Sequence, residues 1–196
     1  MRMGRTETRE DIISVGSELI ARGGFGQTGI DAILKKAKIP KGSFYYYFSS
    51  KEDFGLAVID RFGSEMLEKA RVKLTDEATR PLARLRGYLE ASLSMINQNE
   101  CKRGCLLGDL GQELAHQNEK FRLRLEEVFD AWKSEIAGCL KKARTAGELG
   151  KTADAVQLAD FIVSGWEGAI LRAKVKHSVE PLKQFLDVLF SKVLIP

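Results

Sequence analysis

The sequence contains little proline, cysteine or histidine and has no long hydrophobic run. Its 196 residues include 4 prolines, 3 cysteines and 18 glycines without a repeat, which excludes collagen-like, disordered and disulfide-scaffold chains. The longest nearly uncharged apolar stretch, residues 161–171, contains Glu167 and is well short of the roughly 20 residues that span a bilayer. We therefore expect no transmembrane segment, and one or two compact domains of about 100 to 200 residues each.

The N-terminal segment lacks the apolar region of a signal peptide and alternates charges instead (MRMGRTETRED). We therefore expect a cytoplasmic protein, whose odd number of cysteines (Cys101, Cys105 and Cys139) favours free thiols. The two histidines, His116 and His177, lack metal-ligand spacing with cysteines or carboxylates, and no phosphate-loop, dinucleotide or serine-hydrolase motif occurs. These observations argue against an enzyme and predict neither a metal nor a cofactor.

Positive charge is concentrated near the N-terminus. Residues 1–51 carry nine Lys and Arg against five Asp and Glu, whereas residues 52–196 carry 22 of each, so the net charge of +4 lies in the first quarter. A small basic module joined to a larger neutral one predicts that the first part binds a polyanion. The alternative is a chance asymmetry on a solvated face.

Apolar residues recur at three- and four-residue spacing along nearly the whole chain, which predicts an all-α fold of about nine helices. The first stripe ends at Gly23 and Gly24, and Thr28 is expected to be the N-cap of a short second helix. A capping box at Ser50 and Asp53 predicts a long fourth helix, which would connect a helix-turn-helix domain to a regulatory and dimerisation domain. The expected domains are 1–51 and 52–196, and the later helices are 41–48, 50–73, 81–97, 105–116, 119–146, 154–176 and 178–194.

Two short helices after a longer first helix form the arrangement of a helix-turn-helix DNA-binding domain. The second short helix must be exposed and slim enough to enter the major groove. Phe44 and Phe48 lie four residues apart and should anchor this helix to the core. Some of the hydroxyl groups of Tyr45, Tyr46 and Tyr47 then face solvent, where they can bond phosphates or contact thymine methyl groups.

Four residues around these tyrosines strengthen the prediction of duplex DNA as the partner. Lys41 supplies charge, Ser43 supplies a hydroxyl, and Gly42 lets a phosphate approach the helix N-terminus. Lys51 is placed for a contact with the DNA backbone. The alternative is that the aromatic run is a packing cluster in a helical interaction module with no nucleic-acid role.

The segment from Thr28 to Phe54 resembles the TetR family of one-component transcriptional repressors, through the pattern T-x-x-x-x-I…A-K-I-P-K-G-S-F-Y-Y-Y-F-x-S-K-E-D-F. It departs from that pattern at Lys38, where many members have glycine. The resemblance implies a dimer that reads a pseudo-palindromic operator and is released by an inducer. It also implies phosphate contacts from Thr28, Ser43, Tyr47 and Lys51, and base-edge contacts from Lys41, Tyr45 and Tyr46.

The last two helices agree with a dimer interface in such a protein. Residues 154–176 include small side chains that allow close approach, and residues 178–194 are rich in large apolar ones (Leu182, Phe185, Leu186, Leu189, Phe190 and Val193). So many large apolar residues near a C-terminus predict a partner subunit. The alternative is that they form the core of a single subunit.

Cys105 is the candidate sensor. It follows Lys102, Arg103 and Gly104 and is expected to open a helix, where the helix dipole and the two cations would stabilise a thiolate. A thiolate reacts with oxidants and electrophiles. The alternative is that Cys105 is a small buried hydrophobe, as free cysteines usually are.

Two patterns, G-C-L-L-x-x-L-x-x-E-L and A-K-x-x-x-S-x-E-P-L, resemble the TetR subgroup that represses N-ethylmaleimide reductase and other electrophile-detoxification genes. The resemblance implies that a cysteine matching Cys105 responds to reactive chlorine, quinones or aldehydes. We hypothesise that Lys174 approaches Cys105 and stabilises its thiolate, while Cys101 is an alternative resolving thiol and Cys139 a core residue. The competing functions are a repressor induced by reversible binding of a small apolar molecule, and a thiol-dependent enzyme.

Overall fold

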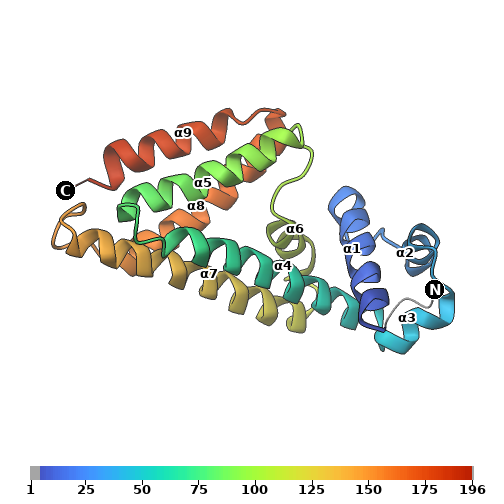
Figure 1. Cartoon of the computed structure of the whole chain (residues 1–196). Helices are drawn as coiled ribbons and strands as arrows, with labels where there is room; N and C mark the ends of the chain where they lie inside the picture. Colours follow the sequence, from blue (N-terminus) through green and yellow to red (C-terminus); the bar gives the residue numbers. More distant parts are fainter. Residues whose placement is uncertain (1–4, 196) are drawn as a thin grey trace. The chain divides into compact units, whose positions relative to one another are not determined.

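The computed structural model describes residues 5–195, which form nine α-helices, one π-helix and no strand (Figure 1). The all-helical prediction is therefore confirmed, whereas residues 1–4 of the segment examined for a signal peptide lie outside the described range. The elements are α1 (Arg5–Gly23), α2 (Ile30–Ala37), α3 (Lys41–Tyr47), α4 (Lys51–Leu74), α5 (Pro81–Gln98), α6 (Leu106–Leu114), α7 (Glu119–Thr145), α8 (Ala155–Lys176), α9 (Glu180–Val188) and the π-helix η1 (Leu189–Val193).

Local chemistry explains where these helices begin and end. Gly24 closes α1 with a φ of +82°, a left-handed conformation that glycine adopts without strain. Asp154 caps α8 by accepting the N–H groups of Val156 and Gln157. Thr28 was expected to cap α2, and this expectation is wrong: Gly29 is the N-cap, and the Thr28 hydroxyl donates to the carbonyl of Gly24 at 2.7 Å.

The helices divide into two compact units that do not follow the order of the sequence. The first comprises the chain up to Gly63 together with Leu106–Leu125, and the second comprises Ser64–Cys105 and the chain from Glu126 onward. Helix α6 thus belongs to the same unit as α1, α2 and α3. The expected functional boundary between residues 51 and 52 stays a prediction.

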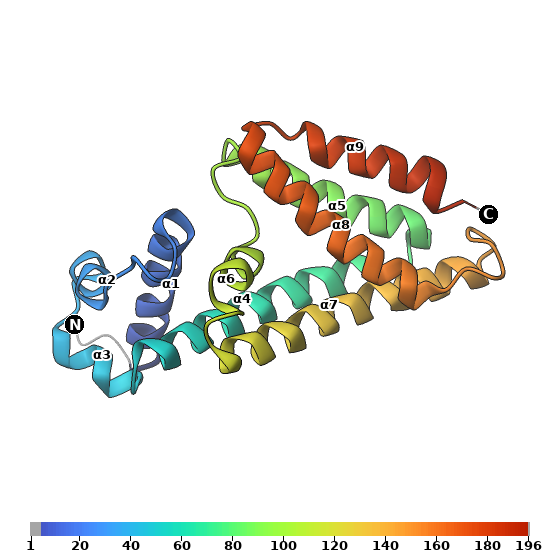
Figure 2. The same ribbon diagram turned by 180° about the vertical axis from the view of Figure 1, so that it is seen from behind.

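In the second unit, α8 and α9 pack against each other, and α5 lies beside α9 (Figure 2). The large apolar residues of the C-terminal segment contribute to this core: Leu182, Leu186 and Leu189 are buried, while Phe185, Phe190 and Val193 are partly buried against it. Their abundance therefore reflects packing within one subunit. Among the described residues, no helix has the length and apolar character needed to cross a bilayer.

Candidate functional site

Helices α2 and α3 are joined by residues 38–40, which make the tight turn of a helix-turn-helix. Lys38 occupies the left-handed region, with φ 57° and ψ 39°, and the N–H of Ile39 donates to the carbonyl of Leu34 at 3.0 Å. The turn therefore adopts the conformation that glycine would favour, although a lysine stands there.

Helix α3 has one buried face and one exposed face. Phe44 and Phe48 are buried and meet Phe54 of α4, with ring centroids 5.3–5.7 Å apart. Tyr45 and Tyr46 lie on the exposed face and keep 56% and 59% of their surface accessible. The predicted division between anchoring phenylalanines and solvent-facing tyrosines is confirmed.

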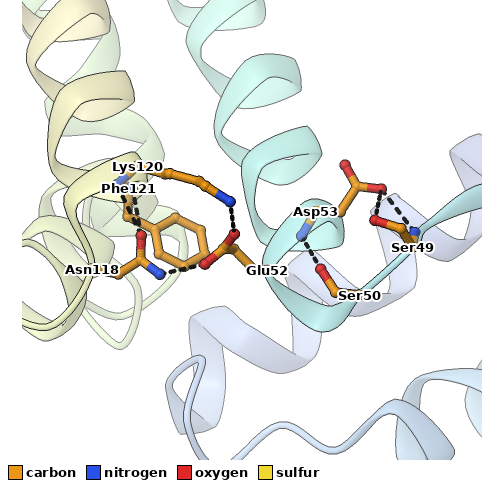
Figure 3. Close-up of polar contacts among 7 residues, drawn as sticks. All are labelled: Ser49, Ser50, Glu52, Asp53, Asn118, Lys120 and Phe121. Atoms are coloured by element: carbon orange, nitrogen blue, oxygen red, sulfur yellow. Dashed lines mark hydrogen bonds and ion pairs between the residues drawn. The ribbon is translucent and has the colours of Figure 1, made fainter.

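Two polar networks within the first unit stabilise the start of α4, and one of them joins it to the start of α7 (Figure 3). The Ser50 hydroxyl accepts the N–H of Asp53 at 3.0 Å, while the Asp53 carboxylate accepts the N–H of Ser49 at 2.9 Å, so the predicted capping box is displaced by one residue on its return side. Glu52 accepts from Lys120 at 2.6 Å and from Asn118 at 2.5 Å, and these bonds hold the pKa of the Glu52 carboxyl below its usual range.

The cations predicted to contact DNA already have partners within the chain. Lys41 pairs with Asp31 at 3.0 Å, and this contact raises the pKa of the Lys41 ammonium. Lys51 donates to the carbonyl of Gly26 at 3.1 Å, and its ammonium lies 4.7 Å from the centre of the Phe25 ring. Both ammonium groups retain further donors for a phosphate, because a lysine carries three.

The remaining predicted DNA contacts differ in exposure. Gly42 is exposed, and a Cβ placed on it would meet no neighbouring atom within 4 Å, so the start of α3 is open to approach. Ser43 and Tyr47 are half-buried. Thr28 is buried, and its hydroxyl donates a hydrogen bond to the carbonyl of Gly24. Of all the predicted DNA contacts, the structure thus presents Lys41, Gly42, Tyr45 and Tyr46 most openly.

Glu113 of α6 makes a contact that the sequence reasoning missed. Its carboxylate accepts the N–H of Phe25 at 2.8 Å and the N–H of Gly26 at 2.6 Å, in the turn between α1 and α2. Charge-assisted bonds of this kind are the stronger hydrogen bonds of proteins. The only signal in the sequence was the glutamate of the G-C-L-L-x-x-L-x-x-E-L pattern, to which no role was given.

Cys105 lies directly before α6 and is half-buried, unlike Cys101 and Cys139, which are buried. A Cβ placed on the preceding Gly104 would lie 3.0 Å from the Lys174 Cδ, so the stem of this lysine packs against the segment that carries Cys105. Cys139 donates to the carbonyl of Pro81 at 3.2 Å, and burial raises the pKa of its thiol to about 11. Cys105 is therefore the cysteine that solvent reaches most readily.

A second group missed by the sequence reasoning lies in the core of the second unit, where Tyr88, Trp132 and Glu167 come from α5, α7 and α8. Burial raises the pKa of the Tyr88 hydroxyl above its usual value, the nearby Cys105 and Glu167 add to the rise, and the adjacent Trp132 indole opposes it. No periodicity distinguishes these residues from ordinary core positions.

Within the described part of the chain, no group of three or more His, Cys, Asp or Glu side chains is arranged to hold a metal ion.

Comparisons with known proteins agree with this geometry. The family model described as bacterial regulatory proteins, tetR family, matches residues 12–58, and the model described as tetracyclin repressor-like, C-terminal domain, matches residues 81–189. Transcriptional regulator AcuR of Cereibacter sphaeroides is 38% identical over 176 residues, which cover 90% of this chain and 80% of that protein. The HTH-type transcriptional repressor NemR of Escherichia coli is 30% identical over 92% of this chain and 90% of its own length.

A solved structure shows the same fold. The crystal structure of the reduced form of Escherichia coli NemR superposes with a TM-score of 0.86 at 29% sequence identity, covering 96% of this chain and 97% of that one. The helix-turn-helix and the helical C-terminal domain therefore occur together, in the same arrangement of elements, in known regulators.

Proposed function

Because the chain belongs to the TetR family of bacterial transcriptional regulators, we propose that it represses transcription as a homodimer that releases its operator when an oxidant or electrophile reacts with Cys105. TetR-family repressors bind DNA operators and act as dimers. The proposal adds to this family role a pseudo-palindromic operator, a dimer formed by α8 and α9, and a covalent inducer.

Helix α3 carries the DNA-binding part of the proposal. Its tyrosines are exposed although its phenylalanines are buried, so aromatic hydroxyl groups face outward from a short helix in a basic module. We assign Tyr45, Tyr46 and Lys41 to base edges, and the remaining contacts to phosphates (Thr28, Gly42, Ser43, Tyr47 and Lys51). Thr28 is the weakest member of this set, because its hydroxyl already donates to Gly24.

An exposed apolar stripe on α8 supports the dimer. Phe161, Leu171 and Val175 are exposed, and Ser164 and Gly168 lie between them at helical spacing. Large apolar side chains flanking small ones let a second helix approach closely. A two-fold dimer presents two copies of α3 to adjacent major-groove turns of a pseudo-palindromic site.

Cys105 carries the sensing part of the proposal. It is half-buried at the N-terminus of α6, where the helix dipole favours a thiolate, and the Lys174 stem packs on the neighbouring Gly104. The existence of a named reduced form of NemR supports a redox response in a similar protein.

Helix α6 offers a covalent route from Cys105 to the helix-turn-helix. Cys105 directly precedes this helix, and Glu113 in its last turn holds the turn between α1 and α2 through two backbone N–H groups. Modification of the thiol would shift the start of α6 and, through Glu113, the support of the helix-turn-helix.

Operator binding is tested with fluorescence anisotropy on the DNA upstream of the chain's own gene. We expect tight binding that weakens by about 10³-fold or more between 50 and 200 mM salt, as for a protein with six to ten phosphate contacts. Binding that ignores both sequence and salt would contradict a repressor.

The sensor is tested by adding hypochlorite or N-ethylmaleimide to preformed complexes of DNA with wild-type protein, Cys105→Ser and the matched control Cys139→Ser. Wild type and the control should release DNA, while Cys105→Ser should stay bound. Release by Cys105→Ser at wild-type reagent concentration would reject the thiol switch and leave a reversible small-molecule inducer as the mechanism.

A further inference from the structure

An exposed ion pair joins the first turn of α2 to the first residue of α3. The Lys41 Nζ lies 3.0 Å from the Asp31 Oδ1, and the two side chains keep 68% and 78% of their surface accessible. Ion pairs this exposed contribute little to stability, because water screens them. Stabilisation of the fold therefore does not account for the pair.

The pair places two unexpected charges on a surface that is proposed to meet DNA. Lys41 begins α3, where a cation is unfavourable because the helix dipole already puts positive charge at this end. Asp31 suits the dipole of α2, yet it is the only acidic residue between Thr28 and Phe48, a stretch that contains four lysines and is expected to face a polyanion. Departures from local rules are expected at functional positions.

Lys41 is the side chain of α3 that can bind a base edge through two hydrogen bonds. The helix has the sequence KGSFYYY, so it contains no Arg, Asn, Gln, Asp or Glu. Its other exposed residues are Gly42, Tyr45 and Tyr46, and a phenol offers a single donor. A carboxylate acceptor beside Lys41 comes instead from α2, through Asp31.

The groups of this ion pair are complementary to the major-groove edge of a G·C base pair. Guanine presents its O6 and N7 acceptors there, which suit a lysine, and cytosine presents its N4 amino donor, which suits a carboxylate. Lys41 uses one of its three donors for Asp31, and Asp31 uses Oδ1 for Lys41, which leaves two donors and the Oδ2 acceptor for DNA. Because guanine O6 and cytosine N4 are paired with each other, the two side chains would meet adjacent atoms.

The turn and the core fix the backbones of Asp31 and Lys41 relative to each other. The Ile39 N–H donates to the Leu34 carbonyl at 3.0 Å across the turn. Leu34 and Phe44 are buried and anchor α2 and α3. Binding of a base pair would then cost little conformational entropy, because the two side chains are already together.

We propose that Asp31 and Lys41 together read one G·C base pair in each half-site of the operator, with Lys41 on guanine and Asp31 on cytosine. The inference rests on the proposed function, because it names a base pair that the helix-turn-helix selects. Asp31 is thereby a specificity-determining residue. The pair is neutral as a whole, so it contributes base selectivity rather than the charge-driven affinity for any duplex.

A library of DNA duplexes with a randomised centre tests the proposal without knowledge of the operator. Sequencing of the duplexes that wild type retains should show one invariant G·C pair in each half-site. This preference should fall about tenfold in Asp31→Ala and in Lys41→Met, which is the scale of a good base contact. Glu18→Ala and Lys36→Met are the matched controls, because these residues form an ion pair at 2.6 Å that lies outside α3, and both should keep the wild-type preference.

Two base analogues at the invariant pair test each contact separately. 7-Deazaguanine lacks the N7 acceptor, and N4-methylcytosine carries a methyl group in place of the outward N4 hydrogen, while both keep Watson–Crick pairing. Each analogue should weaken wild-type binding about tenfold. Lys41→Met should be insensitive to 7-deazaguanine and Asp31→Ala to N4-methylcytosine, while each variant keeps its response to the other analogue.

A purely structural role for the ion pair gives a different pattern. It would weaken binding to every duplex alike and leave both analogue effects in place. Under the proposal, the slope of log affinity against log salt concentration on a duplex of unrelated sequence should steepen by about 0.9 in Asp31→Ala, because the freed Lys41 ammonium binds one more phosphate. Circular dichroism verifies folding, and Lys41→Met keeps the test decisive if Asp31→Ala does not fold.

The outcomes separate this inference from the proposed function. If wild type enriches no sequence from the library, operator binding is rejected, and the G·C contact with it. If wild type enriches half-sites that lack an invariant G·C pair, or whose G·C preference and analogue effects persist in Asp31→Ala, operator binding stands and the role of Asp31 and Lys41 in reading this base pair is overturned.

Discussion

Tyrosine occurs in two opposite settings in this molecule. Tyr45 and Tyr46 on α3 keep 56% and 59% of their surface accessible, while Tyr88 on α5 keeps 9%. The first two lie on the exposed face of α3, where solvent reaches them. The third holds its hydroxyl in the core, where burial raises its pKa and keeps it a proton donor.

The difference shows that the residue type alone does not assign a role. The α3 tyrosines follow from a local pattern, because Phe44 and Phe48 fix which face is buried. The setting of Tyr88 depends instead on the packing of α5 in the core of the second unit. The two faces of α3 are thus encoded locally, whereas the environment of Tyr88 is set by tertiary structure.

The largest expected effect separates the two faces of α3. Phe48→Ala empties a buried site against Phe44 and Phe54, and such truncations cost about 3–5 kcal/mol. Tyr46→Phe removes only an exposed hydroxyl, so the free energy of unfolding should change by less than about 0.5 kcal/mol. Denaturant unfolding measures both variants.

Operator binding completes this first comparison. Tyr46→Phe should weaken binding about tenfold, because a hydrogen bond to a charged phosphate or a base edge is lost without loss of folding. If Tyr46→Phe binds the operator as wild type does, the exposed face of α3 is not the reading surface.

The second prediction extends the comparison from phenols to thiols. Burial raises the pKa of Cys139 from 9.0 to about 11, so at neutral pH it should hold about 100-fold less thiolate than an ordinary cysteine. Iodoacetamide at pH 7.5 should label Cys105 well before Cys139, as measured by peptide mass spectrometry. Labelling of Cys139 should accelerate as the pH rises toward 11.

The raised pKa also predicts the direction of a stability change. The folded state holds the Cys139 proton more tightly than the unfolded state, so this contribution is complete below about pH 9 and disappears as the pH rises through 11. The free energy of unfolding of Cys139→Ala should fall less steeply over this interval than that of wild type. Equal slopes would show that the Cys139 thiol is not buried in solution.

The third prediction tests whether the two regions communicate through α6. Glu113→Ala removes two charge-assisted bonds, and at this half-exposed position we expect the loss to be near the lower end of about 1.5–3 kcal/mol. The amides of Phe25 and Gly26 should exchange hydrogen faster, and N-ethylmaleimide should release less DNA. Glu113→Gln keeps an acceptor oxygen and should be intermediate, whereas wild-type release by Glu113→Ala would exclude this route.

The sequence predicted the helical fold and the two faces of α3, because both depend on local rules. Apolar spacing marked the helices, and the order of phenylalanine and tyrosine in α3 predicted its two faces. The misassigned cap at Thr28 shows the limit: Thr28 and Gly29 are adjacent, and only the backbone geometry reveals that the hydroxyl donates to Gly24. The contacts of Glu113 and Trp132 were not predicted, because their neighbours lie far away in the sequence and no periodicity relates them.

The smallest expected effect concerns backbone strain at Lys38, in the turn between α2 and α3. Lys38 holds a φ of 57°, and a residue with a Cβ pays roughly 1–2 kcal/mol in the left-handed region. Lys38→Gly relieves that strain but gives the unfolded chain more freedom, so the net gain in the free energy of unfolding should be about 0.5–1 kcal/mol. Lys35→Gly makes the same change inside α2, where glycine should cost about 1 kcal/mol, and denaturant midpoints measure both. Opposite signs at Lys38 and Lys35 would show that the turn is set by the local backbone, whereas equal destabilisation would mean that the lysine at this turn is not held in the left-handed region in solution.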